Sequence, residues 1–576
     1  MTSLVDAESV LAIDIGSINT RALLFDLVDG QYHFISTSTA PTTASAPFHD
    51  VSEGVHLALQ RLQEVTGRTL IDQESRLIIP SQPDGDGVDR LAVTCSAGGD
   101  LNIVTMGLLS DVSLQSAQRL AATTYSRIVE SIGLNDRRRP DAQLDAVLLA
   151  EPDIIIISGG TDRGATRSVY RLAEMARQVC RILPKERRPR ILYCGNQALA
   201  KRIKESLELD TRVSVAPNIR PTIDLEDITP ASVQLAKLAA KVRAQKLGGL
   251  SQYASISSAV LPSAFALGRM MRFMNGLSTL AKPTLGVDLG AGSTTLAAAS
   301  ADESYLHVSS SLGVGTSLSK VLEQIDLEDV ARWVPYDLPV EEVRDYLYQK
   351  SLFPASLPLT PETLAIEQAL ARVVLNCAAQ KFRERYPALQ NSYEYIFISG
   401  AALVQAPTPA QTVKMILDGL QPVGVNVLML DPHGLSQALG AIASTNTLLP
   451  AQILETGAYT NLATVICPVS DARPGTTILR LKIIYEEGGD TQVEVKQGSI
   501  VKLPIRYGQT ASLQVEALHG TILDPAAPRL NRGVKNIVGG VSGVVVDARG
   551  RPLALPGDLA RSREKVKIWS QSLDEL

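Results

Sequence analysis

Two short stretches, far apart in the chain, combine an aspartate with glycine and hydroxyl-bearing residues. Residues 14–21 are Asp-Ile-Gly-Ser-Ile-Asn-Thr-Arg, and residues 288–295 are Asp-Leu-Gly-Ala-Gly-Ser-Thr-Thr. Because glycine lets the main chain approach a ligand closely, such turns can present backbone N–H groups and hydroxyls to an anion. The aspartate adds the oxygen ligand that Mg²⁺ prefers. Two such turns facing one another would clamp the β- and γ-phosphates of a nucleotide around the metal.

The sequence therefore predicts an ATP site with Mg²⁺, in which Asp14 and Asp288 are both the metal ligands and the catalytic residues. The predicted nucleotide contacts of the two turns are Gly16, Ser17, Asn19, Thr20, Arg21, Gly290, Gly292, Ser293 and Thr294. Hydrolysis would also need a side chain that orients or activates water. The sequence does not identify that side chain, so a Mg-dependent ATPase activity stays open.

Each turn is expected to join two strands of a small repeated unit. The predicted strands are 10–15, 21–27 and 32–36 in the first copy, and 284–289, 294–299 and 305–310 in the second. A second pair of matches strengthens the predicted repeat, since the apolar runs Ile154–Gly160 and Tyr395–Ala401 each enter a small-residue turn. Two related halves are the simplest interpretation.

The intervening segments predict an α/β chain with a separate β-rich end. Helical spacing of apolar residues predicts a helix over 114–132, and alternating patterns predict parallel βα units from 154 to 245. The glycine- and serine-rich stretch 248–258 is predicted to connect the halves. From Thr477 onward, short β-branched runs alternate with glycine, proline and aspartate turns, which is typical of a small β domain.

The two turns resemble the phosphate-1 and phosphate-2 motifs of the actin, hexokinase and DnaK-chaperone superfamily. Residues 398–402, Ile-Ser-Gly-Ala-Ala, resemble its adenosine motif, which adds Gly400 and Ala401 to the predicted contacts. The closing helix of this superfamily is similar to residues 431–434, Asp-Pro-His-Gly, followed by the small residues of 438–441. This similarity adds Gly440 to the predicted contacts.

The fold that this resemblance implies is α/β. It consists of two ribonuclease-H-like lobes of the actin-like ATPase fold, with inserted βα units and a C-terminal β-rich domain. The expected boundaries are 1–247 for the first lobe with its insertion, 248–450 for the second lobe and 451–576 for the β-rich domain.

A narrower resemblance covers roughly the first 445 residues, which are similar to the glutamate mutase L family. It is carried by the DIGSINTRA start, by Ser96-Ala97-Gly98-Gly99-Asp100-Leu101, and by residues 158–164, Ser-Gly-Gly-Thr-Asp-Arg-Gly, where the family usually has glycine in place of Arg163. Members are encoded with cobalamin-dependent mutases and are suspected of chaperone-like or reactivating roles. The resemblance implies a protein partner, such as a cobalamin-dependent mutase or another enzyme.

Three functions share this fold, and the fold alone does not choose between them. We favour a nucleotide-switched accessory or chaperone-like protein that acts on a partner protein. The alternatives are a small-molecule kinase and a polymerising actin-like protein. A smaller alternative concerns Asp162, which is expected to cap the helix that follows it rather than to bind a second anion.

Composition limits the partners and the compartment. A net charge of -5, from 60 acidic and 55 basic residues, gives no general attraction to nucleic acid. The five scattered cysteines and the acidic N-terminus favour a cytoplasmic protein. The apolar stretch 260–280 is interrupted by Pro262, Arg269 and Arg272, so it is expected to be a buried helix and not a membrane span. The oligomeric state stays open.

Overall fold

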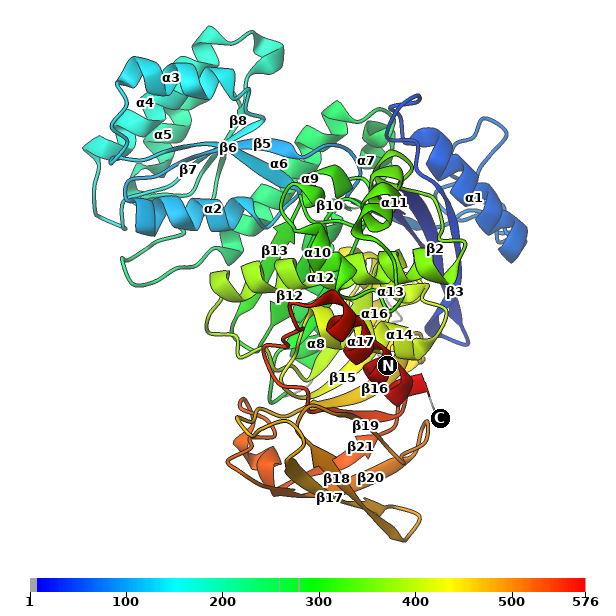
Figure 1. Ribbon diagram of the computed structural model, residues 1–576. Helices are drawn as coiled ribbons and strands as arrows, with labels where there is room; N and C mark the ends of the chain where they lie inside the picture. The colour runs from blue at the N-terminus through cyan, green and yellow to red at the C-terminus, as the bar shows by residue number, and fades with distance from the viewer. Residues whose placement is uncertain (1–7, 258, 278–279, 575–576) are drawn as a thin grey trace, which may run out of the picture. The chain divides into compact units, whose positions relative to one another are not determined.

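The computed structural model (Figure 1) describes residues 8–257, 259–277 and 280–574. The chain divides into two compact units. The first unit comprises residues 1–30, 35–266 and 306–310, and the second comprises 31–34, 267–305 and 311–576. The predicted boundaries at 247/248 and 450/451 stay predictions.

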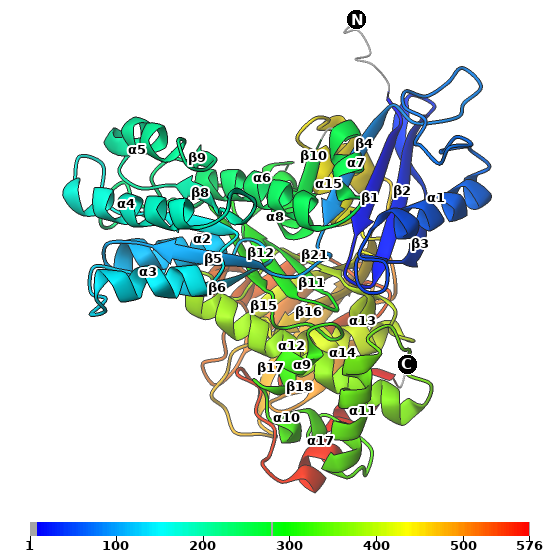
Figure 2. The ribbon, with the colours of Figure 1, turned by 90° about the horizontal axis from the view of Figure 1, so that it is seen from above.

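The first unit is built on a five-stranded sheet of order β10-β4-β1-β2-β3 (Figure 2). Strand β1 pairs antiparallel with β2 and parallel with β4, which in turn pairs parallel with β10. Helix α1 packs on this sheet through Val55, Leu59 and Leu62. The bounds are β1 Val10–Ile15, β2 Asn19–Val28, β3 Gln31–Pro41, α1 Ser52–Thr66, β4 Arg90–Cys95 and β10 Ala259–Pro262.

Between β4 and β10 the chain forms a second sheet, entirely parallel, of order β6-β5-β7-β8-β9. Its central strand β7 is four consecutive isoleucines, of which Ile155 and Ile157 pack with α4 and α5, and Ile154 and Ile156 with α2 and α6. Alternation along a strand thus covers both faces with helices (Figure 1). The bounds are β5 Leu101–Met106, α2 Gln115–Ala121, β6 Ser126–Ile132, α3 Pro140–Leu149, β7 Ile154–Ile157, α4 Arg167–Ile182, β8 Arg190–Tyr193, α5 Ala200–Leu207, β9 Val213–Val215 and α6 Thr229–Lys246.

Three predictions for this unit were wrong in part. The helix predicted over 114–132 ends at Ala121, and 126–132 is the edge strand β6, because its β-branched residues pair with β5. The connection predicted over 248–258 contains a helix, α7 (Leu250–Ile256), and Ser258 lies outside the described residues. The stretch 260–280 begins in β10, and its helix α8 (Ser263–Leu277) starts only after Pro262.

The second unit repeats the strand pattern of the first sheet. Strand β11 pairs antiparallel with β12 and parallel with β14, which pairs parallel with β15. The counterpart of β14 in the first unit is therefore β4, and the predicted match between 154–160 and 395–401 was wrong, because β7 belongs to the inserted sheet. The bounds are β11 Thr284–Leu289, β12 Thr294–Ala299, β13 Ser304–Ser309, β14 Tyr395–Ser399 and β15 Gly424–Leu430.

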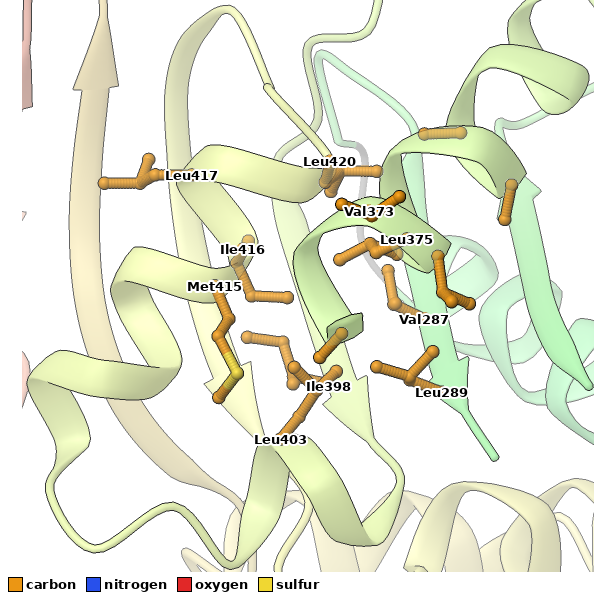
Figure 3. Close-up of a cluster of buried hydrophobic side chains, with 14 of the residues drawn as sticks. Val287, Leu289, Val373, Leu375, Ile398, Leu403, Met415, Ile416, Leu417 and Leu420 are labelled. Carbon is orange, nitrogen blue, oxygen red and sulfur yellow. The ribbon is translucent and has the colours of Figure 1, made fainter. Parts of the chain in front are cut away.

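Buried side chains join this sheet to the helices that cover it (Figure 3). Val287 and Leu289 of β11 and Ile398 of β14 are buried in one cluster with Leu375 of α12 and Ile416 of α14. The helices of this unit are α9 Leu318–Leu322, α10 Leu327–Ala331, α11 Val340–Leu352, α12 Pro361–Arg385, α13 Ala401–Val404, α14 Pro409–Gly419, α15 Leu435–Ile442, α16 Leu448–Glu455 and α17 Leu559–Asp574.

The strands predicted after Thr477 are present, and they divide between two sheets. Strands β17, β18, β20 and β21 form a four-stranded antiparallel sheet. Strands β22 and β19 instead extend the sheet of β11 through β16, which pairs with β15. The bounds are β16 Thr460–Cys467, β17 Thr477–Tyr485, β18 Asp490–Lys496, β19 Ile500–Leu503, β20 Thr510–Ala517, β21 Gly533–Val538 and β22 Val544–Asp547.

A search of the described residues for a helix both long and apolar enough to cross a membrane finds none.

Candidate functional site: two aspartate turns

The first predicted turn is a tight hairpin connection between β1 and β2. The Gly16 N–H donates to the Asn19 carbonyl oxygen over 2.9 Å. A Cβ atom on Gly16 would lie 2.7 Å from that oxygen, so a larger residue would force the turn open. Asp14 lies at the end of β1, in register with Arg21 on β2 and Thr94 on β4.

Two hydroxyl groups hold the Asp14 carboxylate. Its Oδ1 accepts hydrogen bonds from Thr94 Oγ1 at 2.6 Å and from Ser263 Oγ at 2.8 Å. Thr94 comes from the neighbouring parallel strand, and Ser263 is the first residue of α8, directly after β10. Because hydrogen bonds to a charged group are worth about 1.5–3 kcal/mol each, these two fix the orientation of the carboxylate.

The second turn repeats this geometry in the second unit. The Gly290 N–H donates to the Ser293 carbonyl oxygen over 2.9 Å, as Gly16 does to Asn19. Asp288 lies one residue before the end of β11, in register with Thr295 on β12 and Ser399 on β14. Its Oδ1 accepts a hydrogen bond from Ser399 Oγ at 3.0 Å. Ser399 therefore stands to Asp288 as Thr94 stands to Asp14.

Glycine is required where β14 leaves the sheet beside the second turn. Gly400 has a φ of 100°, and a Cβ atom there would lie 2.2 Å from the Leu289 carbonyl oxygen. The backbone is thus in a region that favours glycine, and it passes directly against the end of β11. Ala401 follows as the first residue of α13. Both predicted contacts of the 398–402 motif therefore lie beside the strand that carries Asp288.

Helix α15 supplies a polar side chain next to Ser399. Asp431 accepts hydrogen bonds from the backbone N–H groups of Leu435 and Ser436, both at 2.8 Å, which caps the start of the helix. Gln437 Nε2 then donates to Ser399 Oγ over 3.5 Å. The buried Oε1 of Gln437 has no hydrogen-bond partner in the described part of the chain. Gly440 lies one helical turn further along and is buried.

The threonines of both turns are bonded to neighbouring protein segments. Thr20 Oγ1 lies 2.8 Å from Thr42 Oγ1, and Thr294 Oγ1 donates to the Leu312 carbonyl oxygen over 2.7 Å. Thr20 and Thr294 are both fully buried. In this structure their hydroxyls therefore brace the turns. Because the N–H groups of Gly16 and Gly290 close the turns, the backbone of Ser17 and Asn19, and of Gly292 and Ser293, is the better source of ligand contacts.

Sequence reasoning missed Thr94, Ser263 and Gln437. Thr94 had a signal, because VTCS at 93–96 and ISGA at 398–401 place a hydroxyl residue at matching positions of β4 and β14. Ser263 and Gln437 had none, since they reach the turns from helices whose packing no local pattern reveals. Cys95, directly after Thr94, is buried, and burial raises the pKa of its thiol to about 11. It is a neutral packing residue at ordinary pH.

Asp162 does not cap the helix that follows it. The N-cap residue of α4 is Thr166, and Asp162 Oδ1 instead accepts from the Gln197 N–H at 3.1 Å and from Asn218 Nδ2 at 2.9 Å. The preference for a helix cap was therefore wrong, because the loop turns the carboxylate toward the segments after β8 and β9. Arg163 has a φ of 66°, a conformation that glycine adopts more readily than arginine.

The described residues contain no group of three or more histidine, cysteine, aspartate or glutamate side chains that could hold a metal. Each turn supplies one carboxylate, and Mg²⁺ is commonly bound through one or two carboxylates, with phosphate oxygens and water completing its shell.

A family model described as MutL protein matches residues 10–457, which is more than three quarters of the chain. The chain belongs to the MutL protein family. This confirms the resemblance to glutamate mutase L drawn from the sequence. The match spans both aspartate turns and α15, and it ends at the start of the C-terminal strands.

A curated relative of this MutL-family chain is Protein MutL of Clostridium tetanomorphum. The two are 22% identical over 271 residues, which is 46% of this chain and 52% of the relative. The chain thus matches about half the length of this relative.

Solved structures with similarity to this MutL-family chain have low TM-scores. A nucleotide-free acetone carboxylase has a TM-score of 0.35 at 12% identity and covers 85% of this chain and 81% of its own. A nucleotide-free diol dehydratase-reactivating factor has a TM-score of 0.29 at 12% identity, and the match covers 76% of this chain and 99% of the factor. The xylulose kinase of Bifidobacterium adolescentis has a TM-score of 0.26 at 13% identity, and the match covers 78% of this chain and 93% of the kinase. The strand pairing and the covering helices define a mixed α/β fold.

Proposed function

We propose that this protein binds Mg-ATP, with both aspartate turns contacting the phosphates and the metal of one nucleotide. The observation that carries the proposal is the duplicated geometry: an aspartate at a strand end, a glycine-closed turn after it, and a hydroxyl of the parallel neighbour strand on its Oδ1. A turn with a purely structural role needs no carboxylate held in this way, and two unrelated turns would have the same arrangement only by coincidence. Binding of one nucleotide by both turns explains why the arrangement is repeated.

The strand pairing supports the finer description of the fold. An antiparallel hairpin followed by two parallel strands occurs in both units, as expected of two ribonuclease-H-like lobes of the actin-like ATPase fold. In this proposal the inserted parallel sheet and the C-terminal strands are additions to the two lobes. Gly400 and Ala401 would lie against the adenosine.

Asp14 and Asp288 are the residues proposed to hold Mg²⁺. Both hydroxyl donors to Asp14 use Oδ1, so we assign its Oδ2 to the metal or to a metal-bound water. When bound, the metal would neutralise the charge of the phosphates. The chain's own part is to hold the carboxylates in one orientation and to present the N–H groups of the two turns to the phosphates.

The role that we propose is a nucleotide-switched accessory protein that acts on a partner protein, as the glutamate mutase L resemblance implies. Nucleotide binding in such a protein shifts a conformational equilibrium, and the partner responds to the favoured state. A kinase would need an aspartate positioned to accept a proton from a substrate hydroxyl, and neither the sequence nor the geometry of the described residues singles out one besides Asp14 and Asp288. Hydrolysis of ATP is a separate question for the experiment.

Titration calorimetry with ATP, ADP and GTP, with and without Mg²⁺, tests the proposal. We expect one ATP bound per chain, and binding at least tenfold weaker when Mg²⁺ is removed with EDTA. Two nucleotides per chain would mean that the turns bind separately. No heat with any nucleotide at 1 mM would overturn the proposal. A coupled ADP-release assay on the same sample then measures hydrolysis, and sedimentation with and without ATP tests for filaments.

A further inference from the structure

The segment that begins with the last residue of α11 and leads to α12 exposes several large apolar side chains within eight residues. We call residues 352–359 the 352–359 loop. The exposed fractions are 75% for Leu352, 63% for Phe353, 71% for Leu357 and 92% for Leu359. Tyr348, one turn earlier on α11, is also exposed. Single exposed apolar residues are normal, but a group of this kind marks an interaction surface.

The 352–359 loop is held in place from within. Lys350, itself buried, donates to the Ser356 carbonyl oxygen and forms an ion pair with Glu367 of α12 at 2.7 Å. The Tyr346 hydroxyl donates to the same Glu367 carboxylate over 2.7 Å. Pro354 and Pro358 restrict the backbone further. The apolar side chains are therefore presented by an ordered segment, which lowers the entropy lost when a partner binds.

The surroundings of the 352–359 loop are strongly acidic. Residues 323–367 contain ten acidic and three basic residues, a net charge of -7, whereas the whole chain carries -5. Exposed acidic side chains on α11 include Glu341, Glu342 and Asp345, and Figure 2 shows α11 beside α10. The rest of the chain is thus slightly positive. Some acids of this segment are ion-paired, among them Asp345 with Arg344 and Asp337 with Arg563 of α17, while Glu341 and Glu342 give α11 an acidic exposed face.

We propose that the 352–359 loop and the acidic face of α11 form the docking surface for a partner protein that presents an apolar groove rimmed by lysine and arginine. The inference names a surface for the partner role proposed above and rests on that role. Charge complementarity selects this occupant. A second copy binding through the same surface would bring two acidic faces together, and an anionic lipid surface would repel this one.

Site-specific photo-crosslinking identifies the occupant. A benzoylphenylalanine placed at Leu359 is irradiated in an extract of the cells that produce this protein, and the cross-linked protein is identified and then purified. A matched control places the same group at Leu149, the last residue of α3, which is 87% exposed. We expect a protein cross-link from position 359 that is absent from position 149. No cross-link, or the same cross-links from both positions, would overturn the proposal.

Binding of the purified partner then tests both parts of the surface. The triple variant Phe353→Ser, Leu357→Ser, Leu359→Ser should bind the partner at least tenfold more weakly, while Leu149→Ser with Leu209→Ser should bind as the unchanged protein does. Binding should also weaken at least tenfold between 50 and 500 mM salt, because exposed charges are screened. Equal binding by the triple variant would overturn the proposal, as would a cross-link only to a second copy of this chain.

Two further measurements separate this inference from its alternatives. The triple variant should bind Mg-ATP with unchanged affinity in calorimetry. Failure of the docking-surface proposal therefore leaves the nucleotide proposal standing. Likewise, an Asp14 variant that fails to alter Mg-ATP binding leaves the docking-surface proposal standing. Flotation with vesicles of phosphatidylcholine and phosphatidylglycerol tests a membrane as the occupant. We expect no binding to these vesicles, and binding that the triple variant abolishes would overturn the protein-partner proposal.

Discussion

The two aspartate turns differ in how the protein around them holds the carboxylate. Asp14 receives two direct hydroxyl bonds, from Thr94 on the neighbour strand and from Ser263 at the start of a helix. Asp288 accepts from Ser399, which also donates to the Val287 carbonyl oxygen and is contacted by Gln437 from a helix. The helix beside the first turn thus contacts the carboxylate directly through Ser263, whereas α15 beside the second turn contacts Ser399.

The strand beside each turn shows a second difference. After Thr94 the strand β4 continues through Cys95, a residue with a side chain that packs in the core. After Ser399 the chain leaves the sheet at once through Gly400, with a positive φ and no room for a Cβ atom. Equivalent positions in a repeated unit therefore carry different residues because the backbone turns at different points.

Removal of either carboxylate is the largest expected effect. Asp14→Ala and Asp288→Ala should each abolish the thermal stabilisation by Mg-ATP, which for a ligand at one hundred times its Kd is about 2.7 kcal/mol. The exposed Asp302→Ala serves as the control and should keep the full shift in a thermal-unfolding assay. If both turn variants kept the shift, the site assignment would be wrong. If only one lost it, the turns would not share a nucleotide.

A side chain at Gly400 should destabilise the second unit. Gly400→Ala combines a strained φ with a contact against the Leu289 carbonyl oxygen, and we expect it to lower the stability by about 2 kcal/mol. Gly30→Ala is the matched control, because Gly30 also has a positive φ of 80° but no atom within 4 Å of the added Cβ. It should cost about half as much. Equal midpoints of thermal unfolding for the two variants would contradict the close approach to β11.

The hydroxyl donors should affect affinity more than stability. Ser399→Ala removes the bond to Asp288 and should weaken Mg-ATP binding about tenfold, or about 1.4 kcal/mol. Thr94→Val alone should weaken it less than the double variant with Ser263→Ala, because Ser263 still donates to Asp14 in the single variant. Thr105→Val, which loses a buried hydroxyl contact with Ser131 in the inserted sheet, controls for general effects. Calorimetry on the four proteins would refute the comparison if Thr94→Val were the weakest binder.

Gln437 should have the smallest effect. Its bond to Ser399 is long, and its buried Oε1 has no partner among the described residues, so Gln437→Leu should change the stability by less than about 1 kcal/mol. We expect about threefold weaker Mg-ATP binding from this variant. Gln437→Glu places a second carboxylate near Asp288 and should weaken binding further. An affinity for Mg-ATP unchanged by both substitutions would show that Gln437 does not support nucleotide binding at the second turn.

The local sequence was enough to find both turns and the strands around them. The strands and glycine turns that carry Asp14, Gly16, Asp288 and Gly290 were located because a strand, a glycine turn and a second strand are all encoded within about ten residues. The parallel βα run and the C-terminal strands were likewise predicted from periodicity. The helix predicted over 114–132 failed because apolar residues at helical spacing also fit a helix followed by an edge strand, and the choice depends on pairing with β5.

Tertiary structure alone decided which strands are equivalent and what holds the carboxylates. IIIISGG resembled the run before Gly400 more closely than β4 does, yet β4 is the strand that pairs with β1. Ser263 and Gln437 reach the turns from helices that begin about 250 and 150 residues from the aspartates they support. A local sequence pattern reflects interactions between residues that are close to one another along the chain. Contacts across that distance arise from packing, which no local pattern contains.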